Sequence, residues 1–182
     1  MKKVLSFSRI SWLFWAVMGF GACDSQWDKL GEFKPYEGPT SKVFDMVTNY
    51  SDSGRVKIQL LAPLQLEYES GNQDFPEGIT VNFYNAEGQN YNRLTAKKAI
   101  YEKKNNQYTA QGQVVVHNLL TKETLQTEEL HWRPTQRQIF TEKFVVIQTP
   151  REILKGNGLT ADQDFMAYKI KQPTGKFSLP ED

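Results

Sequence analysis

The sequence predicts an all-β domain of antiparallel strands, and three observations lead to this prediction. From Gly54 onward, apolar residues alternate with polar ones in short runs bounded by Gly, Asn, Pro or Asp, which is typical of strands. No segment after Gly54 carries apolar residues at i, i+3, i+4 and i+7 over the length of a helix, so parallel βαβ units are disfavoured. The stretch 94–116 also recurs as 125–147, which indicates a repeated strand-turn-strand unit.

Length and charge limit the kind of protein. The 182 residues are 39% hydrophobic, which fits one domain of ordinary size after a targeting segment. Lys and Arg number 22 and Asp and Glu number 21, so the formal net charge is +1. Such a balance provides no broad positive field for a phosphate backbone. We therefore expect no nucleic-acid partner.

Residues 1–22 are predicted to be a signal peptide or a membrane anchor. Lys2, Lys3 and Arg9 precede an uncharged apolar run from Ile10 to Ala22, the pattern of a secretion signal. As a helix this run would extend about 20 Å, less than the roughly 30 Å of a bilayer core. A cleaved signal fits this length better than an uncleaved anchor, which stays the alternative.

Cys23 is the single cysteine, so it forms no internal disulfide and no zinc site built on thiolates. The residues from Phe20 to Cys23 resemble the lipobox of bacterial lipoproteins, although Phe20 stands where Leu is usual. The resemblance implies that Cys23 becomes the new N-terminus after cleavage and is diacylated. Its acyl chains would hold the protein at a membrane. The alternative is an apolar residue at the end of a membrane helix.

Residues 23–40 are predicted to be a flexible linker because they are polar and contain Gly31, Pro35, Gly38 and Pro39. The domain is predicted to span residues 41–182. The apolar spacing within 41–50 is compatible with either a helical turn or an entering strand. Turn residues at 85–88, 103–106 and 133–136 are expected to separate hairpin arms.

The repeat is recognised by a shift of 31 positions, which superposes small, aliphatic and aromatic residues in the same order. For example, Leu94 falls on Leu125 and Val114 falls on Val145. One such unit cannot bury its apolar face alone. We therefore expect successive units to stack into a common sandwich or roll.

Motifs of enzymes and metal sites are weak in this chain. The run from Gly156 to Ala161 matches GxGxxA, but no helix follows it, so it is predicted to be a turn. His117 and His131 lack a third partner at ligand spacing, and Asp162 with Asp164 lacks a regular acidic loop. No GxSxG elbow or phosphate-binding loop occurs. We predict a protein that is not an enzyme and has no metal or cofactor.

Several segments resemble one known family, LptC, the envelope component that receives lipopolysaccharide from its export ABC transporter. They extend over roughly 48–175 and are carried, in order, by Leu60 to Pro63, Phe75 to Tyr84, Leu94 to Ala99, Ala110 to Val116, Leu125 to Trp132, and Gly156 to Asp162. Many family members keep an uncleaved transmembrane helix, whereas this apolar run ends at the predicted lipobox.

The resemblance implies a twisted, open antiparallel β-jellyroll whose two sheets part along one side and hold lipid in an apolar trough. Small residues such as Ala99, Ala110 and Gly112 would leave room for an acyl chain. Ordinary core is the more common role for any one such residue, since every sandwich needs such rows. The candidate residues of the lipid-binding groove are Ile58, Leu60, Val81, Phe83, Leu94, Ala96, Val114, Val116, Leu125, Ile139, Val145 and Ile147.

The resemblance also implies the partners and the compartment. The chain would lie on the periplasmic side of the inner membrane, held by its N-terminal anchor. Its N-terminal edge would meet the transporter, and its C-terminal edge, around 165–170, would meet a bridge protein of the same fold by strand pairing. The rival hypothesis is an envelope β-sandwich lipoprotein that binds a glycan or protein, marked by exposed aromatic platforms.

Overall fold

The computed structural model describes residues 35–163, 165 and 167–174. The chain divides into a unit from Met1 to Tyr36 and a unit from Glu37 to Asp182, and the described strands lie in the second unit. The predicted signal segment, Cys23 and Asp164 fall outside the described residues. Within the described part of the chain, no helix has the length and apolar character needed to span a membrane.

The second unit is built from antiparallel strands, with one short 3₁₀ turn, η2, between β8 and β9. The elements are β1 (Ser41–Asp52), β2 (Arg55–Glu67), β3 (Gln73–Phe75), β4 (Ile79–Tyr84), β5 (Asn90–Ala96), β6 (Lys98–Glu102), β7 (Gln107–Asn118), β8 (Thr124–Arg133), η2 (Pro134–Gln136), β9 (Gln138–Gln148), β10 (Ile153–Asp162) and β11 (Tyr168–Thr174).

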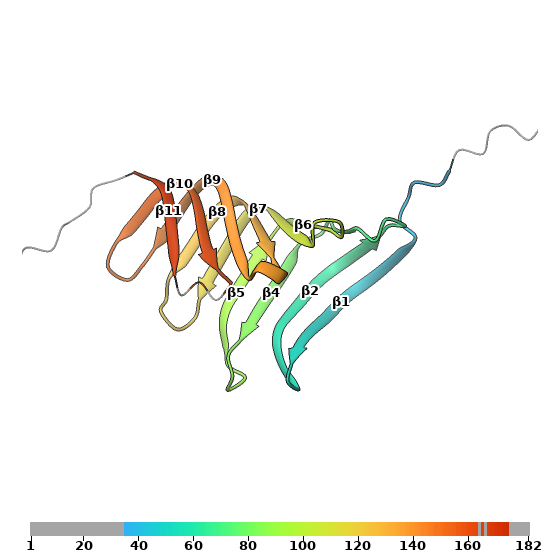
Figure 1. Cartoon of the computed structure of the whole chain (residues 1–182), viewed down its shortest axis with the longest axis horizontal. Coiled ribbons are helices and arrows are strands. Elements are labelled where there is room, and N and C mark those ends of the chain that lie inside the picture. The colour runs from blue at the N-terminus through green and yellow to red at the C-terminus, as the bar shows by residue number, and fades with distance from the viewer. Residues whose placement is uncertain (1–34, 164, 166, 175–182) are drawn as a thin grey trace, which may run out of the picture. The chain divides into compact units, whose positions relative to one another are not determined.

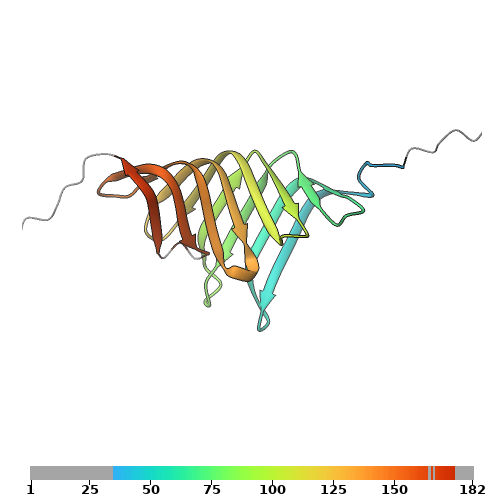
Figure 2. The same cartoon turned by 45° about the horizontal axis from the view of Figure 1, so that its top comes forward.

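The described strands form one hydrogen-bonded sheet in the order β11-β10-β9-β8-β7-β5-β4-β2, with β1 paired to β2. The colours in Figure 2 follow this order, from β1 and β2 at one end to β10 and β11 at the other. Among the described residues, β1 pairs only with β2 and β11 only with β10, so these two strands are the edges of the described sheet. The all-β, antiparallel prediction is confirmed.

This sheet folds over itself into two layers because the long strands take part in both. The second half of β7 pairs with β5, whereas its first half pairs with β6. β2 likewise pairs with β4 along its middle and with β3 at its end. We call the layer that contains β4 and β5 the first layer, and the layer that contains β3 and β6 the second layer (Figure 1).

The strands change layer along a line of irregular positions, which we call the crease. On β7, Gly112 and Gln113 have φ of +77° and +48°, and the register with β8 shifts between Gln111 and Val114. β8 and β9 shift register between Thr127 and His131, and β10 has Gly158 at φ +82°. Such bulges bend a strand sharply, so each long strand serves both layers.

The predicted repeat corresponds to two neighbouring hairpins. In the first copy, β5 and β6 together form one arm, interrupted at Lys97, and β7 forms the other. In the second copy the arms are β8 and β9. Both arms cross the crease in each copy, and the turns predicted at 103–106 and 133–136 connect them. The repeated unit is therefore a bent hairpin.

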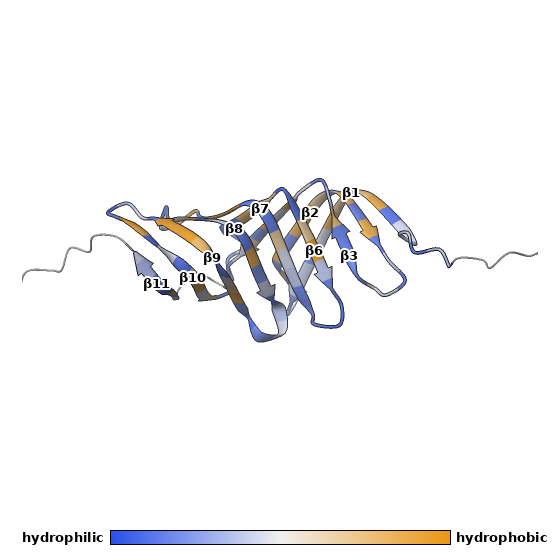
Figure 3. Ribbon diagram, turned by 90° about the horizontal axis from the view of Figure 1, so that it is seen from above, coloured by the Kyte–Doolittle hydropathy of each residue, from blue (hydrophilic) through white to orange (hydrophobic). Residues whose placement is uncertain are grey.

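The core lies between the two layers. Residues directly opposite in neighbouring strands share a face, and one apolar row runs across the first layer through Leu60, Val81, Leu94, Val116, Leu125 and Ile147. All of these side chains are buried. Apolar stretches along the strands and mostly hydrophilic turns are visible in Figure 3. The period-two pattern therefore assigned the inward face correctly.

Two local predictions need correction, and one open alternative is settled. The run from Gly156 to Ala161 lies inside β10 and is not a turn. A Cβ at Gly156 would approach the carbonyl oxygen of Gln172 to 2.6 Å, so glycine permits close contact with β11. The C-terminal edge strand is Tyr168–Thr174 and not 165–170. The segment from Ser41 to Tyr50, left open between helix and strand, forms most of β1.

Candidate functional site

Two rows of side chains, one from each layer, face each other along the side of the sandwich that is opposite the crease. We call this side the seam. The row of the first layer includes Tyr50, Ile58 and Phe83, which are paired across β1, β2 and β4. The row of the second layer is paired across β6 to β10 and consists of Tyr101, Tyr108, Trp132, Ile139 and Ala161.

Aromatic rings bring these rows together. The ring of Tyr108 stacks on Trp132 with centroids 5.1 Å apart and lies 4.5 Å from the ring of Tyr101. Phe83, on the opposite layer, meets Trp132 edge-on at 6.2 Å. Trp132 also donates a hydrogen bond from Nε1 to Gln163 Oε1 at 3.1 Å. The second-layer wall of the seam is thus a connected aromatic stack.

One hydrogen bond bridges the seam directly. The hydroxyls of Tyr50 on β1 and Tyr108 on β7 lie 2.7 Å apart. Burial and the hydrogen bond with Tyr50 raise the pKa of Tyr108 above its ordinary value. The Tyr108 hydroxyl therefore stays protonated across the physiological range.

A cavity of about 860 Å³ opens at the seam. Its apolar and aromatic lining comes from both layers and includes Tyr50, Ile58, Phe83 and Trp132. Its rim carries charged side chains, namely Asp52, Lys57 and Arg137. The remaining lining residues are Tyr84, Asn85, Tyr91, Leu120, Pro134, Thr135 and Gln163. An apolar interior with a charged rim suits an amphiphilic ligand.

The twelve predicted groove residues all lie in strands, and all except Ala96 are buried. Only Ile58 and Phe83 line the seam cavity. Leu60, Val81, Leu94, Ile139 and Val145 line none of the cavities described here and pack in the core between the layers. Burial alone therefore does not separate lipid contacts from ordinary core.

Three other groove candidates converge at a second, very small cavity of about 20 Å³. Val116, Leu125 and Ile147 line it together with Phe165 and Tyr168, which belong to the segment between β10 and β11 and to β11 itself. Phe165 is 9% exposed, with φ of +52°. The space between the layers is thus almost filled at this position.

The small residues predicted to leave room for a chain have other surroundings. Ala99 and Ala110 are paired with each other and are buried. Phe75, which is 1% exposed, lies directly opposite Ala99 on β3 and occupies the adjoining space. Gly112 lies at the crease, where its positive φ favours glycine. Ala99, Ala110 and Gly112 line none of the cavities described here, and room for a chain beside them stays a prediction.

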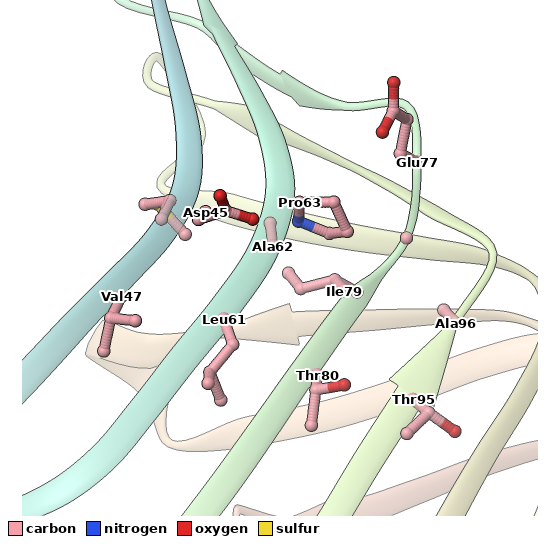
Figure 4. Close-up of a pocket in the computed structure, with 12 residues that line it drawn as sticks. Asp45, Val47, Leu61, Ala62, Pro63, Glu77, Ile79, Thr80, Thr95 and Ala96 are labelled. Carbon is pink, nitrogen blue, oxygen red and sulfur yellow. The ribbon is translucent and has the colours of Figure 1, made fainter.

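A third cavity, of about 480 Å³, lies on the outer side near the crease (Figure 4). β2 and β4 diverge here, because β2 pairs with β4 only as far as Leu61 and then turns toward β3. Val47, Leu61, Thr80 and Thr95 form a row across four strands, and Asp45 and Glu77 border the cavity. Ala96, a predicted groove residue, lines this outer cavity.

The two histidines that were considered as metal ligands have separate surroundings. His117 contacts Thr124 at 3.1 Å, whereas His131 contacts Thr109 at 3.0 Å and Glu129 at 3.2 Å. Among the residues that the structure describes, no group of three or more His, Cys, Asp or Glu is placed to hold a metal ion. The two histidines therefore hydrogen-bond locally within their strand pairs.

The sequence reasoning missed the aromatic seam residues. Tyr50, Tyr91 and Trp132 line the seam cavity, and none of them is among the groove candidates, because the alternating pattern selects mostly aliphatic residues. Their common signal was an amphipathic ring near a strand end, where one side of the ring is apolar and the polar tip reaches water.

A protein-family model described as "Lipopolysaccharide-assembly, LptC-related" matches residues 4–172, which is nearly the whole chain. A search of curated proteins finds no match.

Proposed function

Because the chain belongs to the LptC-related lipopolysaccharide-assembly family, which acts in lipopolysaccharide transport, we propose that it accepts lipopolysaccharide from the inner-membrane ABC transporter. It then passes the lipid along the periplasmic bridge without changing it chemically. The family match supports the transport role, and the seam supports the mode of binding.

The observation that carries the proposal is the seam cavity. Its volume of about 860 Å³ lies within the usual range for sites that bind small molecules, roughly 300–1,000 Å³. Tyr91, Phe83 and Trp132 offer apolar contact to acyl chains, while Lys57 and Arg137 on the rim are positioned to attract phosphate groups. The opening along the seam lets sugars stay in water.

The transfer needs no catalytic group in this chain. A relay holds its cargo weakly enough to release it, so binding energies at successive stations must be similar. The sequence has no phosphate-binding loop, and the energy would come from nucleotide hydrolysis in the transporter. The protein would therefore act as a binding station and not as an enzyme.

The two edge strands are the proposed docking surfaces. β1 and β11 each have one side without a strand partner among the described residues, and such edges accept strands from other proteins. β1 would join the transporter and β11 a bridge protein of the same fold. The N-terminal segment with Cys23 would hold the domain at the periplasmic face of the inner membrane.

Photo-crosslinking in living cells tests the proposal. Benzoylphenylalanine would replace Phe83, which lines the seam cavity, and, as a matched control, Phe144, which is 48% exposed outside the core. We expect ATP-dependent lipopolysaccharide adducts at position 83 and none at position 144. Protein adducts at 144 with no lipid at 83 would instead support the envelope lipoprotein that binds a glycan or protein.

A further inference from the structure

The bond between Tyr50 and Tyr108 lies at one end of the seam. Tyr50 belongs to β1, the N-terminal edge strand, and is directly opposite Ile58 on β2. Tyr108 belongs to the opposite layer and is directly opposite Tyr101 and Trp132. Among the described residues no further strand lies beside β1, so the tyrosine pair bridges the seam at its N-terminal end, which we call the N-terminal mouth of the trough formed by the seam cavity.

The two halves of this closure are held differently. The Tyr108 ring is stacked between Tyr101 and Trp132, at 4.5 and 5.1 Å, so its position is fixed by the second layer. Tyr50 is 42% exposed, and within the described part of the chain its strand pairs only with β2. The register of β1 with β2 also shifts between Tyr50 and Ser51. Tyr50 is therefore the half that can move.

The seam cavity adjoins this bond, since Tyr50 itself lines the cavity along with Ile58 and Phe83. β1 contributes Tyr50 and Asp52 to the lining, so a chain that arrives from the β1 edge passes beside the Tyr50 hydroxyl. The bond is neutral and partly exposed, so its net contribution is small. An apolar chain that fills the cavity can offset its loss.

We infer that the hydroxyl pair of Tyr50 and Tyr108 is a latch at the N-terminal mouth of the trough, which an acyl chain of an amphiphilic lipid displaces as it enters. This inference rests on the proposed function. It assigns to these two hydroxyls control of the rate at which lipid enters the site.

The test removes each hydroxyl and keeps each ring. Tyr50→Phe, Tyr108→Phe and the double variant would be compared with Tyr68→Phe as the matched control. Tyr68 belongs to neither row of the seam and donates its hydroxyl hydrogen bond to Asp74 Oδ2 at 3.0 Å, so the loss of this hydroxyl leaves the bond between Tyr50 and Tyr108 in place. The probe is lipopolysaccharide with a fluorophore on an acyl chain, mixed with the full-length protein in one nonionic detergent.

We expect Tyr50→Phe and Tyr108→Phe each to raise the association rate constant about fivefold, as the loss of a typical neutral hydrogen bond implies. The double variant should equal either single variant, because all three lack the same bond, and Tyr68→Phe should match the wild type. Equal rates in all variants, or additive effects in the double variant, would overturn the latch alone. If the wild-type protein gives no binding signal with the fluorescent lipopolysaccharide, both the latch and the proposed function are overturned.

Discussion

At the scale of single residues, two buried threonines satisfy backbone groups at the crease. Thr127 donates its hydroxyl to the carbonyl oxygen of Phe144 at 2.9 Å. The Thr141 hydroxyl accepts the backbone N–H of Lys143 at 3.0 Å. Both side chains are buried, and bulges leave backbone groups outside the strand ladder. These hydroxyls replace the hydrogen bonds that the bend removes.

Replacing Thr141 with Val should therefore destabilise the fold. The variant leaves the Lys143 N–H without its acceptor, which lowers the free energy of unfolding by about 1–3 kcal/mol. Urea unfolding measures the change. Thr80→Val is the control, because Thr80 is half-buried outside the crease with no side-chain hydrogen bond among those described. Equal losses in the two variants would contradict the role of the hydroxyl.

The pKa of Tyr108 leads to a prediction for alkaline solution. Its pKa is raised in the folded protein above the ordinary value of 10.0, so the unfolded chain loses this proton first as the pH rises. The contribution of the Tyr108 hydroxyl to the free energy of unfolding is fully present below about pH 10. It decreases above that pH by up to about 1.4 kcal/mol per pH unit.

Urea unfolding between pH 8 and 11 would test this effect on the wild type and Tyr108→Phe. The Phe variant has no proton to lose at this position, so its stability should fall less steeply above pH 10. Other titrating groups are common to both proteins, and the difference between the two curves isolates Tyr108. Parallel curves above pH 10 would rule out the raised pKa.

At the scale of elements, the contact between β10 and β11 depends on Gly156. Gly156→Ala places a Cβ 2.6 Å from the carbonyl oxygen of Gln172, so β11 must move away. We expect faster amide hydrogen exchange across Tyr168–Thr174, and a stability loss of about 1–3 kcal/mol. Gly54→Ala is the control, because nothing lies within 4 Å of its added Cβ, although its positive φ adds strain of its own. Unchanged exchange in β11 would refute the prediction.

The sequence predicted the strands better than it predicted the contacts between residues far apart in the chain. Alternating residues such as Val56 and Ile58 mark a strand because the period-two pattern is local. The crease depends on bulges, and a bulge such as that at Gly112 and Gln113 differs from an ordinary turn only in its strand partners. The bond between Tyr50 and Tyr108 joins residues 58 positions apart, for which no local pattern exists. The missed part of the site is thus the part made by contact between layers.

At the scale of the whole molecule, binding of lipid in the seam should stabilise both layers together. A ligand that binds only the folded state at 100 times its dissociation constant raises the free energy of unfolding by about 2.7 kcal/mol. Lipopolysaccharide should produce this increase over detergent alone in urea unfolding. The increase should shrink in Phe83→Ala, which lines the cavity, and persist in Phe144→Ala, which does not. Equal increases in both variants would exclude the seam as the site.

The number of bent hairpin repeats determines the length of the sandwich. Each copy of 31 residues adds two neighbouring strands, and neighbouring strands lie about 4.8 Å apart, so one more copy would lengthen the path for lipid by about 10 Å. Because every copy carries its own bend, such an addition requires no new crease and no new core. The length of a protein of this architecture would then increase in fixed steps, one hairpin at a time.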